Sequence, residues 1–158
     1  MKIPKLILSR ILFILLSFPI FFNTPKVNSA EKIKIIYGIF SRTIEVDSLK
    51  KFAKEGNSTN DLKRILRATG SPENEIQNVL NKDFEIPITI ASKLVYSEIG
   101  NVVLTRLSSI IHPPNALDAR TGMIALRSSI IQGIYLGDGK INLIKFFEGY
   151  PTKTVIIN

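Results

Sequence analysis

The residues with the clearest catalytic potential are a serine in GNSTN, residues 56–60, and His112, the only histidine of the chain. Serine hydrolases of the α/β class hold the nucleophile in G-x-S-x-G, at a strained turn from a strand to a helix. GNSTN lacks the second glycine and lies between two expected helices, so it fits a helix stop followed by a helix cap better. His112 precedes two prolines at a helix end, and without an identified nucleophile it does not make a catalytic site.

The stretch GIYLGDGKI, residues 133–141, has the glycines and the lysine of a phosphate-binding loop. The spacing from Gly133 to Gly139 is one residue too long, and Ile141 stands where Ser or Thr would hold magnesium. We therefore expect a helix end and an Asp-Gly turn there. A single histidine and no cysteine leave few ligands for zinc, so we expect neither a metal nor a cofactor.

Three arginines are the candidate binding residues. Arg120 and Arg127 are seven residues apart on an expected central helix and share a face, and Arg106 lies on the preceding helix. Together they predict a cationic recess for a carboxylate, a phosphate or a lipid head group. The alternative is that they pair with acids such as Glu98 or Asp118, or extend into water.

Phe147 is the candidate contact for a protein partner. It follows Phe146 in KFFEGYP, and two adjacent residues of a helix cannot point in the same direction. One of the two rings is therefore expected near the surface as a docking point. The alternative is that a C-terminal strand packs over both rings.

The elements around these residues predict an α+β fold that is mostly helical. KIKIIY at 32–37 and RTIEV at 42–46 alternate apolar with polar side chains and predict a hairpin. Apolar residues at helical spacing predict about six or seven helices, within residues 47–56, 59–70, 71–80, 88–96, 98–111, 116–136 and 141–149. TKTVIIN at 152–158 predicts a last strand that joins the hairpin in a small sheet against the helices.

Helix caps and buried faces follow from the same pattern. Asp47 or Ser48, Thr59 or Asn60, and Ser71 are expected to begin the first three helices, and Gly56 and Gly70 to end the first two. The helix before the two prolines is expected to bury one stripe, namely Ile99, Val102, Val103, Leu107, Ile110 and Ile111.

Residues 1–29 have the plan of a signal peptide. Basic residues precede the apolar run ILFILLSFPIFF, and small residues follow, so we expect cleavage after Ser29 or Ala30 and one domain over residues 30–158. The alternative is an uncleaved membrane anchor, for which the apolar run is short. Removing residues 1–29 lowers the formal charge from +8 to +4. So small an excess of charge on an exported chain argues against a nucleic-acid partner.

Five stretches, in this order, resemble a cyanobacterial family, domain of unknown function 1400, found in proteins described as alpha/beta hydrolases. They are AEKIKIIYG, DSLKKFAKEG, SKLVYSEIGNVVLTRLSSII, MIALRSSII and FFEGYPTKTVIIN. The resemblance implies a helical module that in longer members precedes a hydrolase domain. The chain reaches Asn158 directly after the module, so we expect the catalytic part to be absent. IIQGIYLGDGK departs from the alanine-rich helix end expected for the family.

These observations lead to one expected function and two alternatives. We expect an exported, non-catalytic accessory module in the periplasm or thylakoid lumen, with an exported hydrolase or an envelope protein as its partner, or a small acidic or lipidic ligand. One alternative is a hydrolase with an unconventional site that uses His112 and a nearby serine or carboxylate. The other is a membrane-tethered structural protein that retains residues 1–22.

Overall fold

The chain enters the fold through a β-hairpin. The structure is a computed structural model that describes residues 29–116 and 118–158; the predicted signal peptide, apart from Ser29, lies outside the described residues. Strands β1 (Lys32–Tyr37) and β2 (Phe40–Glu45) pair antiparallel, with Tyr37 opposite Phe40. Gly38 takes φ +57° at the first position of the two-residue turn, where a side chain would be strained. The predicted hairpin is confirmed, and its second strand begins two residues earlier than expected.

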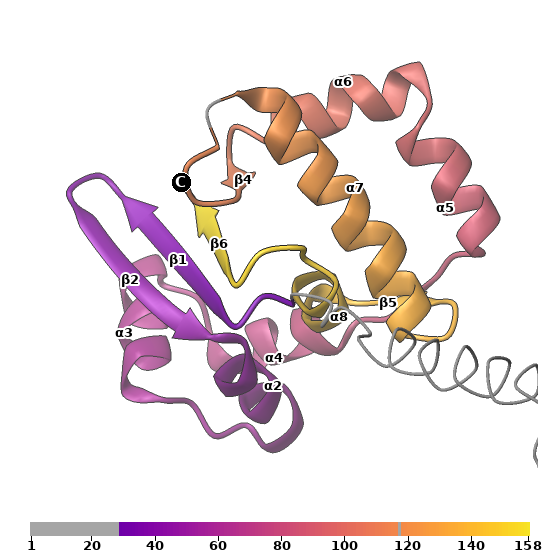
Figure 1. Cartoon of the computed structure of the whole chain (residues 1–158). Helices are drawn as coiled ribbons and strands as arrows, with labels where there is room; N and C mark the ends of the chain where they lie inside the picture. The colour runs from indigo at the N-terminus through magenta and orange to yellow at the C-terminus, as the bar shows by residue number, and fades with distance from the viewer. Residues whose placement is uncertain (1–28, 117) are drawn as a thin grey trace, which may run out of the picture.

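The C-terminal strand completes the sheet. β6 (Thr154–Ile157) pairs parallel with β1 and antiparallel with the two-residue strand β4 (Ile111–His112), which gives the order β2-β1-β6-β4. Ile33 and Val155, partners in the register, are almost completely buried. The predicted pairing of the last strand with the hairpin is therefore confirmed, and the mixed sheet is visible in Figure 1.

Three short helices follow the hairpin and cover one end of the sheet (Figure 1). They are α2 (Val46–Glu55), α3 (Asn60–Thr69) and α4 (Glu73–Asn81). Gly56 and Gly70 end the first two in the left-handed conformation, with φ of 72° and 66°, and Thr59 caps the second, as predicted. The predicted side-chain caps of α2 and α4 are wrong, because Glu45 and Pro72 occupy those positions without a capping hydrogen bond.

The remaining helices form a second group around α7 (Ala119–Leu136). This group contains α5 (Ile88–Val95), α6 (Glu98–Leu107) and α8 (Leu143–Glu148), together with a two-stranded ladder of β3 (Phe84–Glu85) and β5 (Lys140–Ile141). Ser97 accepts a hydrogen bond from the amide of Gly100 and so begins α6 as a separate helix. In Figure 1, α7 runs between the sheet on one side and the α5–α6 pair on the other.

The main core lies where the sheet meets α2, α7 and α8. Phe52, Leu126, Val155 and Tyr150 are its most buried large side chains. Among the described residues no hydrogen-bond partner reaches the hydroxyl of Tyr150, and burial raises the pKa of this phenol. The described residues thus hold seven helices and a small sheet, and the predicted class, α+β and mostly helical, is confirmed.

Candidate functional site

Arg127 connects three helices at the outer side of the helical group. It projects from α7, and its Nε donates to the carbonyl oxygen of Val95 at the end of α5, 2.9 Å away. Its guanidinium also donates to Oδ1 of Asn101 in α6 and lies 4.9 Å from the ring centroid of Tyr96. The sequence suggested carboxylate partners for this arginine, whereas its partners here are a helix-end carbonyl, an amide and a ring. Arg127 therefore fixes α5 and α6 on α7.

Arg106 and Arg120 stay at the surface. Neither makes an ion pair with a described residue at less than 4.0 Å. Asp118 begins α7 by accepting a hydrogen bond from the amide of Thr121, which lowers the pKa of this carboxyl, and the charge of Arg120 lowers it slightly further. No contact within the described residues joins the three arginines, and the cationic recess stays a prediction.

Phe147 is a core residue. Its side chain is 7% exposed, and its ring meets Phe146 edge to face with centroids 5.4 Å apart. Its carbonyl oxygen accepts a hydrogen bond from the amide of Ala30. The expectation that this ring contacts a partner at the surface is therefore corrected, because the segment around residue 30 and the C-terminal strand pack over α8.

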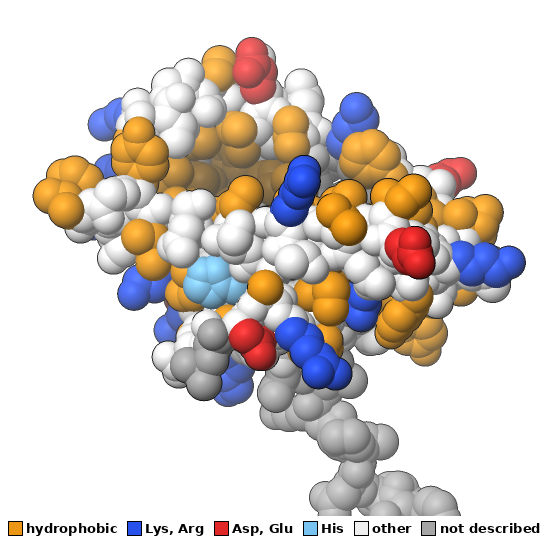
Figure 2. Space-filling view, turned by 90° about the horizontal axis from the view of Figure 1, so that it is seen from above, with side chains coloured by type: hydrophobic (Ala, Val, Ile, Leu, Met, Phe, Trp, Pro, Cys, Tyr) orange, Lys and Arg blue, Asp and Glu red, His pale blue; other side chains and the backbone are white. Residues whose placement is uncertain are grey.

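The outward side of α5 and α6 is apolar. Ile99, the most exposed of the group, has 73% of its surface accessible. We define the α5–α6 face as the exposed residues Ile90, Leu94, Tyr96, Ile99, Val102, Val103, Leu107 and Ile110. The prediction that α6 buries its apolar stripe is wrong for five of its six residues, since only Ile111 packs against the core. Figure 2 shows hydrophobic side chains gathered on this side, with Lys and Arg among them.

Small residues on one side of α6 explain why its large apolar side chains face outward. Its packing side is formed by Gly100, Leu104 and, just beyond the helix, Ser108. A methyl group on Gly100 would overlap the carbonyl oxygen of Leu94, and one on Gly122 of α7 would lie 2.7 Å from Cβ of Ser108. The backbones approach too closely for large side chains, so the isoleucine, valine and leucine residues of α6 point away from the core.

His112 is held by groups that cannot act as nucleophiles. Nδ1 lies 3.0 Å from the carbonyl oxygen of Pro113 and therefore carries the proton, which leaves Nε2 to accept from the Asn158 amide at 3.2 Å. Ser58 of the GNSTN stretch donates instead to Glu73, 3.1 Å away. These contacts give His112 and Ser58 structural partners, and none of the described residues places a nucleophile on the histidine ring.

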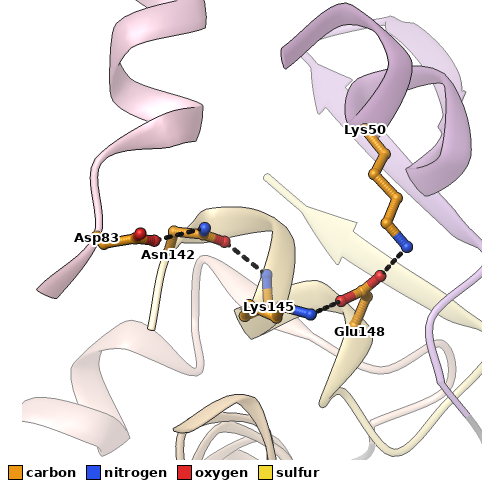
Figure 3. A network of polar contacts seen from close by, with 5 residues as sticks. All are labelled: Lys50, Asp83, Asn142, Lys145 and Glu148. Carbon is orange, nitrogen blue, oxygen red and sulfur yellow. Dashed lines mark hydrogen bonds and ion pairs between the residues drawn. The ribbon is translucent and has the colours of Figure 1, made fainter. Parts of the chain in front are cut away.

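A polar pocket of about 460 Å³ lies beside the start of the hairpin. It is lined by Ser29, Ala30, Glu31, Lys32, Glu45, Val46, Asp47, Lys50 and Glu148. In Figure 3, Glu148 of α8 pairs with Lys50 of α2 and with Lys145, whose Nζ lies 3.1 Å from a carboxylate oxygen. Burial alone raises the pKa of Glu148, but hydrogen bonds from both lysines and their charges bring it below its usual value. Sequence reasoning missed this network, since Lys50 and Glu148 are far apart in the chain.

The same network continues along α8. The side chain of Asn142 begins this helix by accepting from the amide of Lys145 at 2.9 Å. Its amide nitrogen donates to Asp83, in the segment after α4, at 2.8 Å (Figure 3). Glu148 thus joins α8 to α2 through Lys50, and Asn142 joins α8 to the segment after α4 through Asp83, which indicates a structural role for the network.

In residues 29–116 and 118–158 no three His, Asp or Glu side chains gather closely enough to hold a metal ion. No helix of these ranges has the length and apolar character required to cross a bilayer.

Comparison with known proteins places the chain in a family. No curated protein and no solved structure matches it. A family model does match, over residues 29–158, which cover the hairpin, all the described helices and the last strand. The nucleophile motif G-x-S-x-G is not found in the printed sequence, so the family description alone carries no catalytic residue to a position of this chain. The match spans most of the sequence, and the protein therefore belongs to the family described as alpha/beta hydrolase of unknown function (DUF1400).

Proposed function

We propose that this domain is an exported, non-catalytic interaction module, and that another molecule covers its α5–α6 face when it works. The observation that carries the proposal is the exposure of eight apolar side chains on α5, on α6 and in the turns that follow them. Contiguous exposed apolar surface of this kind is uncommon on monomers and marks sites of interaction with proteins, membranes or ligands.

The way in which the face is built supports the same conclusion. Arg127 holds α5 and α6 in place through a helix-end carbonyl, an amide side chain and an aromatic ring. Gly100 and Gly122 allow the close approach that leaves the large apolar residues outside. A rigidly held face loses little conformational entropy on binding. Its rigidity therefore fits a binding surface better than apolar residues that are exposed without a function.

Export is the part of the proposal that rests on the sequence. The leader-like residues 1–29 direct the domain to the periplasm or the thylakoid lumen, and the expected partner is an exported hydrolase, an envelope protein, or an acidic or lipidic ligand. Nucleic acid is not among the expected partners, because the domain without its leader carries a formal charge of only +4.

Labelling in the native compartment tests whether the face is covered. Because the chain contains no cysteine, single-cysteine variants report on one position each. Ile99→Cys lies on the α5–α6 face, and Ile39→Cys lies on the hairpin turn, where the side chain is 93% exposed. A water-soluble maleimide should label both variants when purified, but only the Ile39→Cys variant in the intact compartment. Equal labelling of both variants in the compartment would contradict the proposal.

An ester-hydrolysis screen separates this function from the hydrolase alternative. The purified chain and the His112→Ala variant are assayed with short and long acyl esters. We expect no turnover that depends on His112, since both ring nitrogens already contact Pro113 and Asn158. Turnover that disappears in the His112→Ala variant would establish catalysis and overturn the non-catalytic part of the proposal.

A further inference from the structure

We propose that the molecule covering the α5–α6 face is a membrane surface with anionic lipid head groups. This inference rests on the proposed docking function and names its partner. The residues that carry it are the outward stripe of α6, where Ile99, Val103 and Leu107 follow one another at intervals of four residues.

The distribution of side chains on α6 matches that of helices that meet lipid. In water-soluble proteins the large apolar side chains of a surface helix turn toward the core. Here Gly100 and Ser108 pack against neighbouring backbones, while the isoleucine and valine residues face outward. Small residues between helices and branched apolar residues outside are typical of helices whose surroundings are acyl chains.

The length of α6 limits the kind of contact. It has ten residues, and no described helix is able to cross a bilayer. A short helix with one apolar side lies in the plane of the interface and buries only that side among the head groups and upper acyl chains. The expected attachment is therefore peripheral. Tyr96, at the start of the stripe and largely exposed, has the amphipathic ring that is enriched at this depth.

The charges on these helices identify the head groups. Arg106 stands within the apolar stripe, between Val102 and Val103 on one side and Leu107 on the other, and Lys93 is exposed on α5. Over residues 88–136 the chain has four basic residues, Lys93, Arg106, Arg120 and Arg127, against two acids, Glu98 and Asp118. Asp118 is already engaged at the start of α7, and Arg127 is engaged with α5 and α6, so Lys93, Arg106 and Arg120 remain against Glu98. Cations among apolar side chains complement anionic lipids, each contributing attraction near the surface.

The same charges disfavour a second copy of the chain as the occupant. A symmetric pair formed through this face would bring Arg106 and Lys93 of both copies into one apolar contact. On α5 and α6 only Glu98 is acidic, so this contact would contain more buried cations than acids. Like charges removed from water without partners cost binding energy, whereas phosphate head groups remain hydrated and satisfy them.

Sedimentation with lipid vesicles tests the inference. The protein is purified as it occurs in its source, whether or not residues 1–29 have been removed. It is then mixed with vesicles of phosphatidylcholine, with or without phosphatidylglycerol, at low and high salt. We expect binding to the anionic vesicles that weakens with salt. Ile99→Glu should bind at least about tenfold more weakly, because it removes a large apolar contact and adds a negative charge. Any contribution from the N-terminal segment is common to all variants and cancels in this comparison.

Two control variants keep the result specific. Ile39→Glu makes the same chemical change at the hairpin turn, outside the α5–α6 face, and should bind like the unchanged chain. Arg106→Gln should weaken binding to anionic vesicles about fivefold and leave binding to neutral vesicles nearly unchanged. All three positions are exposed, so thermal melting should show that the variants remain folded.

The two proposals fail in different ways. If the Ile99→Cys variant is protected in the compartment but the chain does not bind vesicles, or if Ile99→Glu and Ile39→Glu bind them equally, the lipid inference is overturned and docking to a protein remains. Ultracentrifugation of the Ile99→Glu variant then distinguishes a second copy from a different protein. If the Ile99→Cys variant reacts freely in the compartment, the docking function itself is overturned.

Discussion

At the scale of single residues, Arg127 makes the most consequential contacts of the helical group. A charged donor that satisfies the last carbonyl of α5 and a side chain of α6 contributes more than a surface ion pair, because these hydrogen bonds are partly shielded from water. We expect Arg127→Ala to lower the free energy of unfolding by about 2 kcal/mol. Chemical denaturation measures this loss.

The outcome for Arg127 also separates its two interpretations. Arg127→Lys keeps the charge but cannot reach Val95 and Asn101 together, so it should recover only part of the stability. If Arg127→Ala instead left stability unchanged and abolished the binding of an anionic ligand, the arginine would be a binding residue and not a positioning residue.

Tyr150 carries a buried hydroxyl for which no described residue provides a partner. Removing such a group from an apolar site relieves a desolvation cost, so Tyr150→Phe should raise stability by about 1 kcal/mol. Because the pKa of the buried phenol is raised, ionisation of Tyr150 opposes folding above the pKa of an unfolded tyrosine, about 10. The variant should therefore also lose less stability at alkaline pH. Thermal melting at neutral and alkaline pH checks both effects. A variant less stable than the unchanged chain would show that the hydroxyl of Tyr150 has a hydrogen-bond partner.

The ion pairs of Glu148 predict a pH dependence of stability. A carboxyl with a lowered folded pKa stabilises the fold above the unfolded value, about 4.3, and loses this contribution as the pH falls through the folded pKa. The hydrogen bond that Lys50 donates to Glu148 raises the pKa of Lys50, so the lysine contributes stability below about 10.4 and loses this contribution as the pH rises through its folded pKa. Between these two pKa values, about 4.3 and about 10.4, the ion pair makes a constant contribution to the free energy of unfolding.

Denaturation between pH 7 and pH 3 tests the role of Glu148. Glu148→Gln should lower stability at pH 7 by up to about 1 kcal/mol and make the decline toward acid less steep than in the unchanged chain. The control is Glu31→Gln. Glu31 also pairs with a lysine, since Nζ of Lys153 lies 3.5 Å from Oε1 of Glu31, but both of these side chains are exposed. An equally steep acid decline with and without Glu148 would assign the effect to other carboxyls.

At the scale of elements, the packing of α6 on α7 depends on the small residue Gly122. Replacing glycine by alanine inside a helix normally stabilises it by up to about 1 kcal/mol. Here the new methyl group would lie 2.7 Å from Cβ of Ser108, so Gly122→Ala should destabilise the protein by about 1 to 3 kcal/mol. Adding Ser108→Gly to the variant should restore part of the loss, which a double-mutant cycle measures. Independent, additive effects would show that the two residues are not in contact.

The orientation of α6 shows what periodicity reveals and what it leaves open. The spacing of its apolar residues predicts a helix, and the helix is present. The same spacing also predicts that the apolar side faces inward, and this prediction is wrong. Helical periodicity defines a face but not its partner, and the packing side here is formed by Gly100 and Leu104, which give only a weak hydrophobic signal.

Local signals explain the correct predictions. Gly56, Gly70 and Thr59 end or begin helices through their own backbone and side-chain chemistry, so the sequence reveals them. The fold brings the carbonyl oxygen of Val95 to Arg127 and the side-chain amide of Asn158 to His112, and no residue type marks these partners in the sequence. The two-residue strands β3, β4 and β5 also lack a periodic signal and were missed.

At the scale of the whole molecule, the way the chain enters the fold predicts where processing ends. Ala30 is buried in the main core, and its amide donates to the carbonyl oxygen of Phe147. A chain beginning at Ala30 keeps these contacts and places its ammonium group at the polar pocket that contains Glu45, Asp47 and Glu148. A chain beginning at Glu31 loses them. We therefore expect cleavage after Ser29.

Intact-mass measurement of the exported protein tests this expectation. The mature chain should retain Ala30, and a recombinant form that begins at Glu31 should be less stable by about 1 kcal/mol, because it lacks one buried methyl group. A native mass that is one alanine residue lighter would contradict the expectation. A mass that includes residues 1–29 would support the anchor alternative.

The position of β6 between β1 and β4 also determines when the sheet can form during synthesis of the chain. A ribosome releases β1 early and β6 only after every helix has been made. Until then the hairpin lacks its parallel partner and the core lacks Val155, so the sheet cannot close before β6 has been made. For the proposed export, this delay would allow translocation to begin before the folded domain has formed.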